Sequence, residues 1–124
     1  MGNYFQKEIE CASADQIRAW QSERLVKQVK NIYDNVPYYR TRMQNKGLEP
    51  GDIKSIDDLH KLPFITKDDL RDAYPYGLLA RPLKDCVRMQ STSGTTGRRV
   101  VAFYTQHDLD LWEDCCARAI VAAG

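Results

Sequence analysis

The chain has 124 residues, of which 43% are hydrophobic and 28% charged, and its formal net charge is +1. This length suits one small domain or part of a larger one, and the composition is ordinary for a soluble globular protein. So balanced a charge excludes bulk electrostatic binding to nucleic acid or an anionic membrane, and no apolar run approaches the ~18–20 residues that span a bilayer. We therefore expect no nucleic-acid partner, no membrane partner and a cytoplasmic location.

The four cysteines show neither a disulfide framework nor a metal-binding pattern. They are Cys11, Cys86, Cys115 and Cys116, and no two are spaced as C-x-x-C. Adjacent residues on a helix point ~100° apart, so Cys115 and Cys116 suit neither one disulfide nor one metal ion. We expect ordinary free thiols, as reducing compartments favour, and no metal site.

The first strong element is a helix that begins after Ser13. Ser13 and Gln16 have the S-x-x-Q spacing of a capping box, in which each side chain satisfies an orphan N–H group of the first turn. Apolar residues then recur at helical spacing as far as Tyr33, and this pattern predicts a helix to about Asp34. We interpret its charged face as solvent-exposed, with a basic contact surface as the alternative.

Asn35-Val36-Pro37 ends that helix, because a residue before proline is pushed away from helical dihedral angles. Pro37 suits the first turn of a second helix, and Gly47 suits the left-handed residue that stops it. We interpret Tyr38 and Tyr39 as packing between the two helices, with a substrate pocket as the alternative.

Residues 48–76 are predicted to form short helical turns joined by capped linkers. Ser55 with Asp58, and Thr66 with Asp69, repeat one local device, a hydroxyl N-cap followed by acids in the first turn. The paired aspartates of these turns also raise the hypothesis of acid–base chemistry or a metal. Helix-end electrostatics accounts for both pairs, so we assign them no catalytic role.

After Pro82 the pattern changes to the period of two that is typical of strands. Residues 86–90 alternate unlike side chains, and residues 100–104 are mostly β-branched or aromatic, which predicts a buried second strand. A T-x-x-D cap at Thr105 then begins a final helix, on whose apolar stripe we expect Trp112 to lie in the core rather than to stack on an adenine. The stripe comprises Leu109, Trp112, Cys116, Ala119, Ile120 and Ala123.

Between the two strands, Ser91 to Gly97 contain five hydroxyl residues and two glycines, and Arg98 and Arg99 follow. A hairpin turn needs far fewer special residues. Glycines allow close backbone approach to a phosphate, hydroxyl and N–H groups donate hydrogen bonds to its oxygens, and arginines add charge. The pattern therefore predicts a loop for nucleotide phosphates, with a polar hairpin tip as the alternative. It is neither a Walker A motif nor the G-x-G-x-x-G fingerprint.

The order of predicted elements defines an α/β chain with two parts. Residues 1–80 form a helical N-terminal cap with capped linkers, and residues 81–124 form the truncated start of an α/β nucleotide-binding domain. Two strands and one helix cannot build a closed sheet layer alone. We therefore expect a fragment of a larger fold, or a chain that pairs to cover its exposed edges.

Ser93-Gly94-Thr95-Thr96-Gly97 between two strands is similar to the phosphate loop of adenylate-forming enzymes, the acyl-CoA synthetase superfamily. The surrounding residues resemble, in order, the signature segments of phenylacetate–CoA ligases, and they cover nearly all of the chain. These segments are Tyr33 to Arg40, Asp52 to Ser55, Leu62 to Arg71, Tyr74 to Leu78, Val87-Arg88, Tyr104-Thr105, Asp108-Leu109, Trp112 and Ala117-Arg118. By this resemblance the chain is identified as the N-terminal portion of such a ligase.

The resemblance implies a helical cap followed by the first strand–loop–strand–helix of an adenylate-forming enzyme's N-terminal domain. It also implies a two-step reaction, in which ATP and an aryl carboxylate form an acyl-adenylate and pyrophosphate with the help of Mg²⁺. The thiol of coenzyme A then displaces AMP. In the family the loop holds the ATP phosphates, and the positions that match are Thr92, Ser93, Gly94, Thr95, Thr96 and Gly97, with Arg98 as an added cation.

Two departures from the family pattern bear on activity. Many superfamily members continue the loop with x-Pro-Lys, whereas this chain has Arg98-Arg99-Val100. Strand alternation lets only one arginine face the ligand, and we favour Arg98 over Arg99. The family's adenine-binding residues, Mg²⁺ ligand, acyl pocket and catalytic lysine would lie beyond Gly124. We therefore expect no catalytic residue in these 124 residues and no turnover by them alone.

Three alternatives stay open at the level of sequence. The complete protein could adenylate a different acid or use a different acceptor. The chain could instead be a non-catalytic module that binds phosphate, or a structural piece that forms a homodimer. The identity of the acid is not encoded here, because nothing in residues 1–80 substitutes for the missing acyl pocket.

Overall fold

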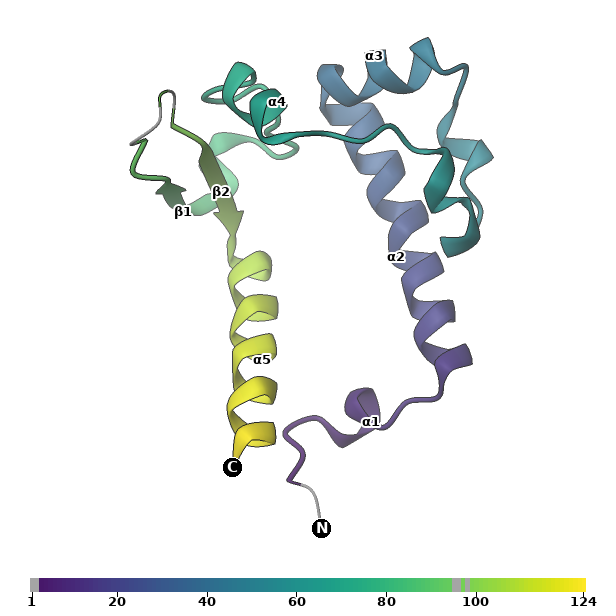
Figure 1. The fold of residues 1–124 in the computed structure, drawn as a ribbon, viewed down its shortest axis with the longest axis vertical. Coiled ribbons are helices and arrows are strands. Elements are labelled where there is room, and N and C mark those ends of the chain that lie inside the picture. Colours follow the sequence, from purple (N-terminus) through teal and green to yellow (C-terminus); the bar gives the residue numbers. More distant parts are fainter. Residues whose placement is uncertain (1–2, 95–96, 98) are drawn as a thin grey trace.

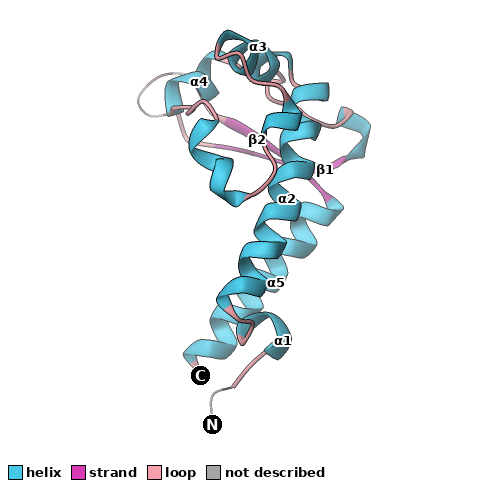
Figure 2. Cartoon of the chain, turned by 90° about the vertical axis from the view of Figure 1, so that its right-hand side faces the viewer, coloured by secondary structure: helices cyan, strands magenta, loops and turns pink. Residues whose placement is uncertain are grey.

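The computed structural model describes residues 3–94, 97 and 99–124. Its helices are α1 (Lys7–Glu10), α2 (Ala14–Asn35), α3 (Pro37–Asn45), α4 (Lys67–Asp72) and α5 (Gln106–Ala123), and its strands are β1 (Cys86–Ser91) and β2 (Val101–Thr105). Short 3-10 helices occupy Pro50–Asp52, Ile56–Lys61 and Leu83–Asp85. The long helices α2 and α5 form two arms, joined at one end by α3, α4 and the strands, while α1 reaches toward the C-terminal end of α5 (Figures 1 and 2).

Helices α2 and α3 begin and end where the local sequence patterns predict. Ser13 accepts a hydrogen bond from the backbone of Gln16 at 3.2 Å, and the Gln16 side chain accepts one from the backbone of Ser13, so the predicted capping box is present. Val36 is extended and ends α2, and Pro37 occupies the first turn of α3. Gly47 has a φ of 67°, in the left-handed region that a residue without a Cβ atom enters at no steric cost. These predictions are confirmed.

A small hydrophobic core joins α2, α3 and the first 3-10 segment. Val29, Met43 and Ile53 are each 1% exposed, and partly buried apolar side chains surround them. Each fully buried side chain of this kind contributes roughly 1.5–3 kcal/mol of transfer free energy. The core therefore holds the helical hairpin against the connector that follows it.

The connector is tied down by polar contacts as well. The predicted capping boxes at Ser55 and Thr66 are both present. The Ser22 hydroxyl of α2 accepts a hydrogen bond from the backbone of Ile56 at 3.0 Å, and Arg18 pairs with Asp57. Residues 48–76 are thus an ordered series of capped turns, as predicted.

The strands pair as an antiparallel hairpin, as the sequence indicates. Ser91 lies opposite Val101 at the loop end and Cys86 lies opposite Thr105 at the other, with an irregularity between Cys86 and Arg88. Thr105 then caps α5 in the predicted capping box with Asp108. The hairpin is the whole sheet in the described part of the chain. The four cysteines carry free thiols, as expected.

Two predictions of burial are wrong, one for the last helix and one for the second strand. Trp112 on the apolar stripe of α5 is 44% exposed and Ile120 is 70% exposed, and no α5 side chain in the described chain is buried. Trp112 does contact the ring of Tyr104, at a centroid distance of 5.6 Å. Strand β2 is half-buried rather than fully buried. The physical reason is that a stripe gives the apolar face of a helix, whereas burial needs a second layer over that face.

Candidate functional site

The predicted phosphate loop lies at the tip of the β1–β2 hairpin (Figure 1). The backbone N–H of Thr92 donates to the carbonyl oxygen of Val100 at 3.0 Å, and the backbone N–H of Val100 donates to Thr92 Oγ1 at 3.1 Å. The pairing of the two strands therefore continues one step beyond them and ends on a threonine hydroxyl. That hydroxyl retains its own proton for a further hydrogen bond.

Two glycines shape the bend of the loop. Gly94 has a φ of 68° and Gly97 a φ of 130°, both in the region where other residues are strained. The backbone N–H of Gly97 donates to the carbonyl oxygen of Gly94 at 3.2 Å. A Cβ atom on Gly94 would lie 2.7 Å from Cγ of Arg99, whereas one on Gly97 would meet nothing within 4 Å. Gly94 is therefore required both by its dihedral angle and by the neighbouring arginine.

Four residues of the predicted site lie among the described residues at the tip of the hairpin. Thr92, Ser93 and Gly97 are exposed and Gly94 is half-buried, so all four are accessible on the hairpin tip. Thr95, Thr96 and Arg98 lie outside the described residues. The backbone N–H of Val100 donates to the hydroxyl oxygen of Thr92.

The accessible part of the loop is a hydrogen-bond donor surface. Among described residues, no hydrogen bond joins the backbone N–H groups of Ser93 and Gly94, or the Ser93 hydroxyl, to another protein group. Consecutive backbone N–H groups in a bend that includes a left-handed residue form a concavity suited to anions. These free donors are compatible with the anion-binding role that the sequence predicts.

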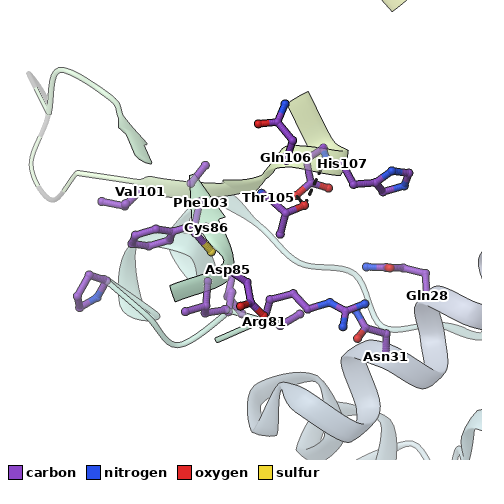
Figure 3. Close-up of a pocket in the computed structure, with 16 residues that line it drawn as sticks. Gln28, Asn31, Arg81, Asp85, Cys86, Val101, Phe103, Thr105, Gln106 and His107 are labelled. Carbon is purple, nitrogen blue, oxygen red and sulfur yellow. Dashed lines mark hydrogen bonds between the residues drawn. The ribbon is translucent and has the colours of Figure 1, made fainter. Parts of the chain in front are cut away.

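A cavity lies beside the hairpin, and its lining does not include the loop. It has a volume of about 820 Å³ and lies between α2, residues 75–86 and the junction of β2 with α5. Gln28 and Asn31 project into it from α2, and Arg81 and Asn31 point toward one another (Figure 3). The side chains of Arg81 and Gln28 are exposed. This cavity is an open groove lined by both polar and apolar side chains, and its size alone does not make it the site.

The carboxylates with strongly shifted pKa values lie in the helical region. The hydroxyl of Tyr38 donates to Asp69 at 2.5 Å, and this bond, with those from the backbone and hydroxyl of Thr66, lowers the pKa of Asp69 to about 2. Arg42 also pairs with Asp69, at 2.8 Å. Both carboxylate oxygens are engaged, so Asp69 is a helix cap and a tertiary link. No group of His, Cys, Asp and Glu in the described residues could hold a metal ion.

Sequence reasoning missed two contacts. Tyr38 joins α3 to Asp69 of α4 across 31 positions, and Arg99 lies against Gly94. The first has no local signal, because the partners are distant in sequence. The second had a partial signal, because two adjacent arginines follow the glycine-rich loop in the sequence, but the contact of Arg99 with Gly94 depends on the path of the backbone.

Comparison with known proteins supports the resemblance. No protein-family model matches the chain. The chain is 48% identical to the phenylacetate-coenzyme A ligase of Pseudomonas putida and 45% identical to that of Escherichia coli (strain K12), each over 116 residues. It is 40% identical over 120 residues to the ligase of Thermus thermophilus. The match covers 94% of this chain but 26% of the Pseudomonas ligase, so the chain spans about a quarter of the length of such relatives.

Solved structures agree on the fold. A 2-hydroxyisobutyryl-CoA ligase in complex with 2-HIB-AMP and CoA aligns with a TM-score of 0.84 at 25% identity, over 95% of this chain and 26% of that one. The same ligase in its postadenylation state aligns with a TM-score of 0.76. The arrangement of arms and hairpin is thus that of a segment of an adenylate-forming CoA ligase. The predicted resemblance to the N-terminal portion of phenylacetate–CoA ligases is confirmed.

Proposed function

We propose that this chain is the part of an AMP-forming aryl-acid–CoA ligase that holds the phosphates of ATP, in an enzyme that acts on phenylacetate or a similar acid. One observation carries the proposal. A loop of glycines and hydroxyls at the tip of a hairpin occurs in a chain that phenylacetate-coenzyme A ligases match over 94% of its length. We further propose that residues 1–80 are a helical cap and residues 81–124 begin the nucleotide-binding domain.

The chemistry of the first step explains why such a loop is needed. Attack of the acid carboxylate on the α-phosphorus of ATP forms the acyl-adenylate, and the breaking bond transfers negative charge to the departing pyrophosphate. Preorganised N–H and O–H donors stabilise that charge as it develops. The proposed donors and glycines are Thr92, Ser93, Gly94, Thr95, Thr96, Gly97 and Arg98. In the second step the CoA thiol attacks the acyl carbon and releases AMP.

Mg²⁺ is implied by the resemblance alone. We assign no magnesium ligand among the described residues, because they contain no carboxylate cluster to bind the ion. When bound elsewhere, the ion would screen the phosphate charge. The loop contributes hydrogen bonds and side-chain charge, and the acid itself is bound outside the proposed loop.

A chimeric enzyme tests the proposal. The matching segment of a phenylacetate–CoA ligase would be replaced by this chain, and pyrophosphate release and thioester formation would be measured. We expect an active chimera. Changing Ser93, Thr95 and Thr96 together to alanine should lower pyrophosphate release by about 100-fold or more, because each such donor is worth a large factor in related oxyanion sites.

Ser91→Ala is the matched control, because this exposed hydroxyl lies in β1, outside the proposed donor set. It should leave pyrophosphate release nearly unchanged. Circular dichroism of each chimera establishes that it is folded. A folded triple-alanine chimera that releases pyrophosphate at the parent rate would refute the assignment of the loop.

A further inference from the structure

Arg99 is drawn back over the loop instead of extending along the strand. Its Cγ lies 2.7 Å and its Nε 3.5 Å from the position that a Cβ atom on Gly94 would occupy. Gly94 precedes it by five positions, so the contact closes the bend across its base. The stem of the arginine therefore fills the space that the glycine leaves empty.

The charge of Arg99 has no protein partner among the described residues. No ion pair and no side-chain hydrogen bond of Arg99 occurs there, although several other arginines of the chain are paired. Arg99 is exposed. An unpaired guanidinium held beside the free N–H groups of Ser93 and Gly94 adds charge and up to five donors to the same surface.

We propose that Arg99 is a phosphate-binding cation of this loop, which replaces the charge that Val100 lacks at the position where related loops carry lysine. The proposal rests on the proposed function and specifies its ligand class as a polyphosphate anion, pyrophosphate or the triphosphate of ATP. A guanidinium bonds two phosphate oxygens at once, and its planar geometry suits a bridged polyphosphate. Gly94 has a second role here, because a Cβ atom would displace the arginine stem.

This assignment adds Arg99 to the arginine that the sequence favoured, Arg98, which lies outside the described residues. Strand alternation was the reason for that choice, and alternation governs extended residues. Arg99 lies between the loop and β2, in a segment without regular secondary structure. The contact with Gly94 shows that its side chain follows the bend of the loop.

The experiment measures the affinity of the complete 124-residue chain for inorganic pyrophosphate by isothermal titration calorimetry at low ionic strength. Arg99→Gln keeps most of the stem against Gly94 and removes the charge, and we expect it to weaken binding about 10-fold. Arg99→Lys restores a charge without the planar fork, and its affinity should fall between those of the parent chain and Arg99→Gln. Arg88→Gln, a change at an exposed arginine of β1, is the matched control and should stay within about twofold of the parent.

The outcomes separate this proposal from the function on which it rests. If Arg99→Gln binds like the parent while alanine at Ser93, Thr95 and Thr96 abolishes binding, the loop is a phosphate site and the role of Arg99 is overturned. If the parent chain shows no binding at millimolar pyrophosphate, both the loop's phosphate role and the role of Arg99 are overturned. If Arg99→Gln and Arg88→Gln weaken pyrophosphate binding equally, the loss reflects the net charge of the chain and not a specific contact, and the proposal is overturned.

Discussion

The helical region and the hairpin region of this chain are specified by the same local signals but differ in tertiary burial. Capping boxes begin both α2 and α5, and both helices carry apolar residues at helical spacing. In the helical region Val29, Met43 and Ile53 are 1% exposed, whereas Ile120 of α5 is 70% exposed. The helical region encloses a core of its own. In the hairpin region, no second layer of described residues covers the apolar face of α5.

The difference shows what local structure can achieve without a core. The hairpin, its glycines and the cap of α5 form from hydrogen bonds and dihedral preferences between near neighbours. Packing energy depends on a second surface, which the described residues do not supply for α5. The phosphate loop that we propose would use backbone groups and an arginine, which need little packing, so such a site is compatible with the less buried region.

The largest expected difference between the two regions is the loss of stability when an apolar side chain is truncated. Met43→Ala should lower the free energy of unfolding by about 2–5 kcal/mol, because it removes a buried side chain and leaves a cavity between α2, α3 and the connector. Urea unfolding followed by circular dichroism measures the change. Ile120→Ala removes a similar apolar group from an exposed position and should change the free energy by less than about 0.5 kcal/mol. Equal losses in the two variants would mean that the regions do not differ in burial.

A smaller expected effect is the loss of stability of the helical region at low pH. The pKa of Asp69 is about 2 in the folded chain, lowered first by the Tyr38 hydroxyl, and below its unfolded value of ~3.9. The folded state therefore binds fewer protons, and the stabilisation by Asp69 is complete above the unfolded pKa and is lost as the pH falls toward about 2. Tyr38→Phe should raise this pKa and should shift the loss of helical-region stability to higher pH.

Carbon-13 NMR of the Asp69 carboxyl group follows this titration residue by residue. Tyr39→Phe is the matched control, because the Asp69 carboxylate is bonded by the hydroxyl of Tyr38, and the two rings meet edge-on at a centroid distance of 5.8 Å. We expect the control to titrate like the parent. An unchanged midpoint in Tyr38→Phe would show that the tyrosine bond does not hold Asp69 ionised.

The sequence predicted those features whose causes lie within a few positions. The cap at Ser13, the stop at Gly47 and the antiparallel hairpin belong to this class. The Tyr38–Asp69 link joins residues 31 positions apart, so no local pattern announced it. The apolar stripe of α5 predicts Trp112 in a core, but a stripe shows only which face of a helix is apolar and not whether another surface covers it. The contact of Arg99 with Gly94 likewise follows from the path of the backbone and not from the order of residues.

The central claim is that the hairpin loop is the phosphate site, and NMR titration of the isotope-labelled chain with pyrophosphate tests it most directly. We expect saturable shifts of the backbone amides of Ser93 and Gly94, together with the side-chain Nε–H of Arg99, while the amides of α2 and α3 stay in place. Shifts confined to the cavity beside Gln28 and Arg81, or no shifts at millimolar pyrophosphate, would contradict it.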